Sequence, residues 1–225
     1  MVEKNSKKLS ASFEDNIRYM NEILPVAESF DIIRRDIIIG GKASVFYYID
    51  GFIKDEVMLK IMDSFLSVED KDMPEDAEGF IQQLVPYVEV DIAEDFDQVI
   101  RNVLSGPAAL FIEGYKECII LDCRTYPARS VDEPDKDKSL RGSRDGFVET
   151  IVFNTALMRR RIRDPHLIME MMEAGQASRT DIAVCYMSDR VDKELLDNLK
   201  KRIGNLQLED LRMNQQSLAE ALFKR

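Results

Sequence analysis

The stretch from Phe30 to Phe52, FDIIRRDIIIGGKASVFYYIDGF, most strongly limits the folds open to this chain. Two segments rich in Ile, Val, Phe and Tyr flank the Gly40-Gly41 pair, which is typical of two strands joined by a tight turn. Residues 54–66 follow with apolar side chains at helical spacing. Because strand-like and helix-like segments succeed each other, the sequence predicts an α/β fold.

The same alternation continues along the chain. We expect a helix over 13–24 that is capped by Ser12, a strand and then a helix that ends at Gly106, and a second hairpin that turns near Glu113-Gly114. Further expected elements are helices at 54–66, 147–163 and 192–203, a new helix that starts at His166, a strand at 180–187, a final strand and helix within 206–223, and loops at 67–79 and 124–146.

Two parts of this pattern look alike. SVFYYIDGFIKDEVMLKI and DIAVCYMSDRVDKELLDNL each read as a strand, a polar turn and an amphipathic helix, and a second strand and helix follow each. We therefore expect two small α/β subdomains, each a mixed β-sheet packed with helices. The predicted division is an N-terminal tail and helix at 1–28, subdomain 1 at 29–105 and subdomain 2 at 106–225.

Charge restricts the partners of the chain. The 225 residues are 45% hydrophobic, enough for a sizeable core, and carry a net charge of -11, which opposes general binding to nucleic acid or to an anionic bilayer. Twelve carboxylates against one lysine lie between Asp63 and Asp97, whereas ten Lys and Arg face six Asp and Glu between Arg124 and Arg163. Such a division favours docking against another charged surface.

Few residues suit catalysis. Cys118, Cys123 and Cys185 lack metal-ligand spacing and are expected as reduced core residues. His166 has no motif around it, and we find no nucleotide-binding loop and no hydrolase motif. The apolar runs are too short to cross a bilayer. We therefore expect a soluble chain that is not an enzyme and takes no cofactor and no metal.

The stretch RSVDEPDKDKSLRGSRDGFVETIVFNTALMRRRIRDP combines glycines with arginines. At the expected helix start, Arg141 and Arg144 could hold an anion. Alternatively, Ser143 or Asp145 caps the helix, and the arginines pair with the nearby carboxylates. The run RRRIR ends the helix either as a basic collar against lipid headgroups or an acidic partner, or as a solvated helix end. Val148 and Ile162 are expected on the apolar face of this helix.

The sequence of this stretch resembles the soluble N-terminal domain of GerA-type germinant receptor A subunits. The resemblance extends over GPAALFIEGYKECIILDCRTYPARSVDEPD before it and SRTDIAVCYM after it. Ser143, where the receptors often have proline after RG, suits a sporulation-protein branch of that family. The resemblance implies a cytoplasmic domain on the spore-core face of the spore inner membrane, followed by membrane spans that this chain lacks. It also implies other spore membrane protein subunits as partners, in a homo- or hetero-oligomer.

The resemblance gives a set of candidate interaction or structural residues. We expect Phe147 to anchor the loop to the core, and Glu149 and Asn154 to hold backbone groups. The favoured function is a non-catalytic assembly or signalling domain; the alternative is a sensor that binds a small ligand between its two lobes, with Arg124, Arg129 and Arg144 as anion contacts. The full set is Arg124, Arg129, Glu133, Pro134, Arg141, Gly142, Arg144, Gly146, Phe147, Glu149, Asn154, Arg159, Arg160, Arg161 and Arg163.

Overall fold

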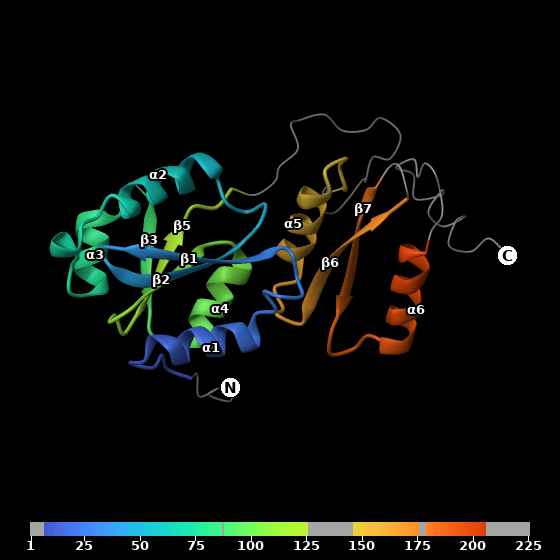
Figure 1. Ribbon diagram of the computed structural model, residues 1–225, viewed down its shortest axis with the longest axis horizontal. Coiled ribbons are helices and arrows are strands. Elements are labelled where there is room, and N and C mark those ends of the chain that lie inside the picture. Colours follow the sequence, from blue (N-terminus) through green and yellow to red (C-terminus); the bar gives the residue numbers. More distant parts are fainter. Residues whose placement is uncertain (1–6, 87, 126–145, 176–178, 206–225) are drawn as a thin grey trace, which may run out of the picture. The chain divides into compact units, whose positions relative to one another are not determined.

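The computed structural model describes residues 7–86, 88–125, 146–175 and 179–205, which form the helices and strands of two compact units (Figure 1). Unit 1 runs up to Val26 and then from Asp31 to Pro165, and unit 2 consists of Ala27–Phe30 and the chain from His166 onward. The predicted α/β class, with helices packed on sheets, is confirmed. The division differs from the one expected near residue 105, because strands from both sides of that point share one sheet.

A five-stranded sheet forms the centre of unit 1, in the order β1-β2-β4-β5-β3, and every pairing in it is antiparallel rather than mixed. Gly40 and Gly41 join β1 to β2 with φ angles of 50° and 74°, which glycine adopts at little steric cost. Both predicted hairpins are confirmed. The strands are β1 (Ile32–Ile39), β2 (Lys42–Ile49), β3 (Glu89–Ala93), β4 (Ala108–Ile112) and β5 (Cys118–Asp122).

Helices cover both faces of this sheet (Figure 1). Side chains alternate along a strand, so β2 places Val45 and Tyr47 in one core cluster and Phe46 in the other. Both faces are therefore buried, and this explains why the inner strands are nearly continuous apolar runs. The first face is covered by α1 (Phe13–Ile23) and α4 (Phe96–Ser105), and the second by α2 (Asp55–Leu66) and α3 (Ala77–Leu84).

Side-chain caps determine where several helices begin. The Ser12 side chain accepts a hydrogen bond from a first-turn N–H of α1, as predicted. Asp76 does the same for α3 through the N–H of Gly79. The prediction of a loop over 67–79 was wrong, because this segment contains the short helix η1 (Asp70–Asp72) and the start of α3. Gly79 lies in the first turn of α3 and does not end a loop.

The described residues of unit 2 form a hairpin and one helix. The predicted β7 (Thr180–Met187) and α6 (Lys193–Gly204) are confirmed, and β6 (Leu167–Ala174) pairs with β7 along its whole length. The helix expected to start at His166 was wrong, because this pairing overrides the helix propensity of the Met, Glu and Ala residues in LIMEMMEA. His166 is exposed, and its carbonyl accepts a hydrogen bond from the N–H of Ser188.

α5 (Ile151–Arg161) belongs to unit 1 and is shorter at both ends than the predicted helix 147–163. Val148 and Ile162, which were expected on its apolar face, therefore lie outside the helix. Ala156 joins the first core cluster instead. The strand and helix expected within 206–223 fall outside the described residues.

Candidate interaction surface on α5

A pair of hydrogen bonds holds the chain as it enters α5. The Oδ1 of Asn154 accepts from the N–H of Val148, and its Nδ2 donates to the carbonyl of Val148, both at 2.7 Å. Asn16 makes the same pair of bonds with Ser10 ahead of α1, at 2.7 and 2.8 Å. Each asparagine is the fourth residue of its helix and bonds six residues back. The sequence predicts a backbone-holding role for Asn154 but not for Asn16, although the shared position in the two helices is a signal that could have indicated it.

The residues just before α5 do not provide the expected anchor. Phe147 is 66% exposed and belongs to neither core cluster of unit 1. Glu149 is also exposed, and its carboxylate accepts no hydrogen bond from another described residue. Because α5 begins only at Ile151, Phe147 precedes the helix and does not lie on its buried face. Gly146 is the first described residue of this entry segment.

A buried ion pair anchors the last turn of α5. Arg159 donates from Nε to Oδ2 of Asp31 at 2.7 Å and from Nη2 to Oδ1 at 3.1 Å. Its Nη1 donates to the carbonyl of Asp164 at 2.9 Å. The side chains of Arg159 and Asp31 are 0% and 1% exposed. The surface position expected for Arg159 was therefore wrong. It shares a buried helix face with Thr155 and Ala156, and Asp31, just before β1, supplies its counter-charge.

The other three arginines of this run form an arginine cluster, which we define as Arg160, Arg161 and Arg163, and all three are exposed. Arg163 donates from Nε to the carbonyl of Arg160 at 3.3 Å. Cations at a helix C-terminus are favoured by the helix dipole, by about 0.3 to 1 kcal/mol each at a surface. The cluster thus places positive charge at the surface of a chain whose net charge is -11.

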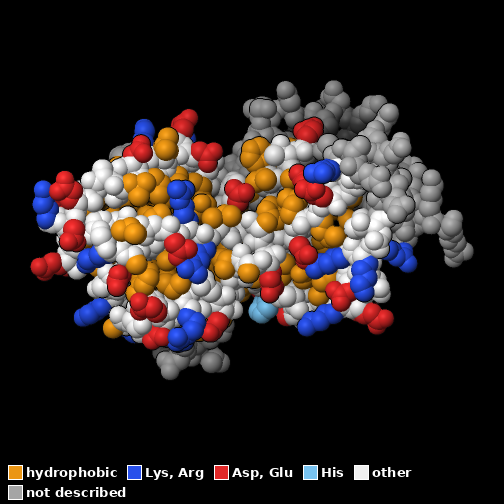
Figure 2. All heavy atoms as spheres, viewed as in Figure 1, with side chains coloured by type: hydrophobic (Ala, Val, Ile, Leu, Met, Phe, Trp, Pro, Cys, Tyr) orange, Lys and Arg blue, Asp and Glu red, His pale blue; other side chains and the backbone are white. Residues whose placement is uncertain are grey.

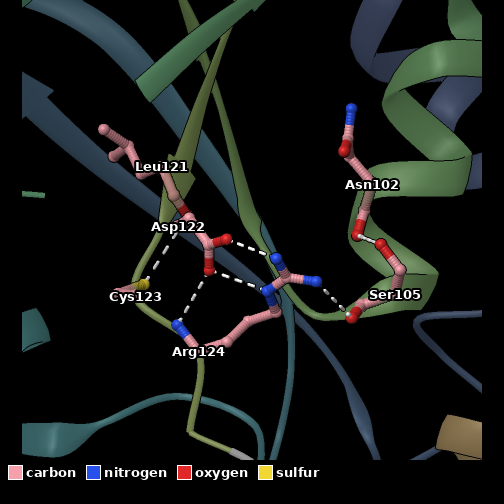
Figure 3. A network of polar contacts seen from close by, with 6 residues as sticks. All are labelled: Asn102, Ser105, Leu121, Asp122, Cys123 and Arg124. Atoms are coloured by element: carbon pink, nitrogen blue, oxygen red, sulfur yellow. Dashed lines mark hydrogen bonds and ion pairs between the residues drawn. The ribbon is translucent and has the colours of Figure 1, made fainter. Parts of the chain in front are cut away.

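Arg124 fastens β5 to the end of α4 (Figure 3). Its Nε donates to Oδ1 of Asp122 at 2.7 Å, Nη2 binds the second carboxylate oxygen, and Nη1 donates to the carbonyl of Ser105 at 3.3 Å. The hydrogen bonds from Arg124 lower the pKa of Asp122. Gly106 ends α4 with φ of 118°, and a Cβ there would lie 2.6 Å from Cδ of Arg124. The structure thus gives Arg124 a role within the fold.

The remaining predicted residues lie in the segment 126–145, outside the part of the chain that the structure describes. Both readings of the loop, as an anion site or as a helix cap with paired arginines, therefore stay predictions. The residues are Arg129, Glu133, Pro134, Arg141, Gly142 and Arg144.

Cys118, Cys123 and Cys185 form no disulfide with one another, and the first two are buried. Burial raises the pKa of Cys118 well above its ordinary value and that of Cys123 to about 11, so both remain protonated near neutral pH and are weak nucleophiles. Among the described residues we find no group of His, Cys, Asp and Glu arranged to hold a metal ion. Within the same ranges, none of the helices has the length and apolar character needed to span a bilayer.

Comparison with known proteins confirms the resemblance seen in the sequence. Stage V sporulation protein AF of Bacillus subtilis (strain 168) is 33% identical over 206 residues, which cover 91% of this chain and 42% of that protein. The protein named "Uncharacterized membrane protein YfkQ" from the same organism is 27% identical over 211 residues, covering 93% of this chain and 40% of that protein. The chain thus spans about two fifths of the length of these relatives.

A solved structure shares the fold. The crystal structure of the N-terminal domain of the A subunit of the Bacillus megaterium spore germinant receptor GerK3 matches with a TM-score of 0.67 and 20% sequence identity, over 96% of this chain and 81% of that one. The model of the family described as Bacillus/Clostridium GerA spore germination protein matches residues 18–225. The chain therefore belongs to the GerA spore germination protein family.

Proposed function

We propose that this chain is a non-catalytic interaction domain that acts in the assembly or signalling of a germination complex. Its partners are other spore membrane protein subunits, in a homo- or hetero-oligomer. Membership of the GerA family and the relatives named for sporulation and germination support this role.

The proposed location is the cytoplasmic, spore-core face of the spore inner membrane. One relative is named as a membrane protein, and this chain covers only 40% of its length. A protein of that length has room for membrane spans beyond the matched region. In this proposal the described units stand at the membrane surface and contact neighbouring subunits.

The observation that carries the proposal is the arginine cluster. Arg160, Arg161 and Arg163 are exposed on a chain whose net charge is -11, whereas Arg159 is buried. A local basic surface on an acidic domain suits an acidic surface on a neighbour, because complementary charge steers docking and selects the partner.

Reversing the charges tests this role in the full-length protein. Arg160→Glu, Arg161→Glu and Arg163→Glu together should reduce co-purification of other spore membrane proteins about tenfold. A matched control reverses Lys193, Lys201 and Arg202 on α6, which are also exposed, and should leave co-purification unchanged. Equal recovery from both variants would show that the cluster does not bind partners. Flotation with anionic vesicles separates contact with lipid from contact with protein.

The small-ligand alternative has less support. Arg124, one of the three expected anion contacts, is bound to Asp122 and Ser105 within unit 1. Thermal-shift screening of the 225-residue chain against amino acids, sugars and nucleotides tests it, since a ligand of the native state raises the melting temperature.

A further inference from the structure

A groove of about 1030 Å³ runs along α2 in unit 1. It lies among α2, the β1–β2 strands and the first turn of α5, and every residue that lines it belongs to unit 1. Its apolar lining includes Leu59, Met62 and Leu66 from α2 and Val152 and Phe153 from α5. The groove is thus built from elements that share one folded unit.

Three of these apolar side chains are unusually exposed. Leu59 is 62% exposed, Leu66 is 58% exposed and Phe153 is 45% exposed, and they are among the large hydrophobic residues most open to solvent in the described chain. Single exposed leucines are ordinary, but several that line one groove mark a binding surface. The same helix buries Ile61, Met62 and Phe65 in the core, so the exposed Leu59 and Leu66 extend its apolar surface beyond the part that the core uses.

The spacing on α2 suits a helical occupant. Leu59, Met62 and Leu66 are related as i, i+3 and i+7, so they lie along one side of the helix over about 10 Å. An amphipathic helix carries apolar side chains at the same spacing, so its apolar face can pack against this stripe and against Phe153 across the groove.

The charged residues along the groove indicate the charge that a bound partner should carry. Four carboxylates line it, those of Asp50, Asp55, Glu56 and Asp63, against the cations of Arg35 and Lys54. Lys54 is itself 4.0 Å from Glu56. Hydrophobic and acidic side chains accordingly lie side by side along α2 in Figure 2. This excess of negative charge opposes an anionic bilayer and favours a partner that carries Lys or Arg.

We propose that this groove binds an amphipathic helix of a partner protein, with its apolar face in the groove and Lys or Arg along its edges. The inference rests on the proposed role of the chain as an interaction domain and names the surface and the chemistry of the partner. It involves residues separate from the arginine cluster, so the two surfaces can be tested independently.

Site-specific photo-cross-linking in the full-length protein tests the proposal. A benzophenone side chain at Leu59 or Phe153 should cross-link to a segment that mass spectrometry identifies as a basic amphipathic helix of another protein. The same probe at Leu195, which is 67% exposed in unit 2, should not capture that segment. Cross-links to a second copy of this chain, to lipid, to an acidic or extended segment, or to nothing would each overturn the proposal.

A synthetic probe gives an independent measurement on the 225-residue chain. The probe is a peptide of about 16 residues with Leu at positions i, i+3 and i+7 flanked by Lys, and its control has the same composition in scrambled order. Leu59→Ser with Leu66→Ser should weaken binding of the ordered peptide about tenfold, whereas Leu195→Ser should change it less than about twofold. Equal binding of the scrambled peptide, or an equal effect of Leu195→Ser, would refute the proposal that the groove binds an amphipathic helix.

The two proposals fail in different ways. If the Leu59 and Leu66 substitutions have no effect while reversal of the arginine cluster still removes partners, the groove inference fails and the proposed function stands. If reversal of the cluster also has no effect, the proposed function fails with it.

Discussion

At the scale of single residues, the four neighbouring arginines at the end of α5 divide into two kinds. Arg159 is buried with Asp31, while Arg160 is exposed to solvent. Their order in the sequence does not separate them, because the division depends on which side of the helix faces the core and on a carboxylate 128 residues away. Arg159 is therefore part of the buried structure, whereas Arg160 lies at the surface.

Arg159→Ala should lower the free energy of unfolding by about 3 to 5 kcal/mol, because it leaves the Asp31 carboxylate buried without its partner. Arg160→Ala, one residue away and exposed, should change it by less than about 0.5 kcal/mol. Urea unfolding followed by circular dichroism measures both. Similar losses for the two variants would mean that the ion pair contributes nothing beyond an ordinary surface residue.

The buried thiol of Cys123 makes the free energy of unfolding depend on pH in the alkaline range. Burial raises the pKa of Cys123 from 9.0 to about 11, so the folded state keeps a proton that the unfolded chain loses. Its contribution is complete below pH 9 and is lost as the pH rises toward 11, by about 2 kcal/mol. Cys123→Ala should therefore flatten the fall in unfolding free energy between pH 9 and 11. A slope identical to that of the unmodified chain would contradict this origin.

At the scale of elements, α5 depends on a side chain inside the helix to hold the segment that precedes it. Thr150 stands at the N-cap without making a side-chain capping bond, and Asn154 instead satisfies both backbone groups of Val148. Asn154→Ala should therefore cost about 1 to 2 kcal/mol and speed hydrogen exchange at the Val148 amide. Asn154→Asp keeps the acceptor and should have a smaller effect on exchange. Unchanged exchange in Asn154→Ala would refute this role.

Elements whose signals are local could be predicted from the sequence. The 32–49 hairpin follows from apolar β-branched runs around two glycines, and α4 from its helical spacing and terminal Gly106. β6 could not, because LIMEMMEA favours a helix by composition and becomes a strand only by pairing with β7. α3 was hidden by the acidic residues and glycine around its start.

At the scale of the whole molecule, the least predictable features depend on residues far apart in the chain. β2 pairs with β4 through partners such as Val45 and Phe111, so a division near residue 105 would separate strands of one sheet. The candidate site shows the same limit. The sequence indicated that the arginine run and Asn154 matter, but the groove along α2 is lined by residues of α2 and α5 that are about 90 positions apart in the chain.

Stability should be divided unequally between the two units. Both large core clusters lie within unit 1 and use no residue beyond Ala156. The core cluster of unit 2 has Ala174, Val184 and Ile203 as its buried members, and Leu167, Ile168 and Met169 of β6 are buried as well. These residues lie mostly on a two-stranded hairpin, and such a hairpin is marginal by itself. A chain that ends at Pro165 should therefore unfold in one cooperative urea transition, whereas residues 166–225 alone should show none.

The shortened chain should nevertheless be less stable than the complete one. Truncation removes Met169, which accepts a hydrogen bond from the N–H of Phe30 and donates one to the hydroxyl of Ser29, each at 2.9 Å. Two such bonds contribute about 1 to 3 kcal/mol, so the urea midpoint should fall while the transition remains cooperative. A cooperative transition in residues 166–225 alone would show that the core of unit 2 suffices for independent folding. Absence of a cooperative transition in the chain that ends at Pro165 would show that the core of unit 1 is insufficient and that the two units fold as one.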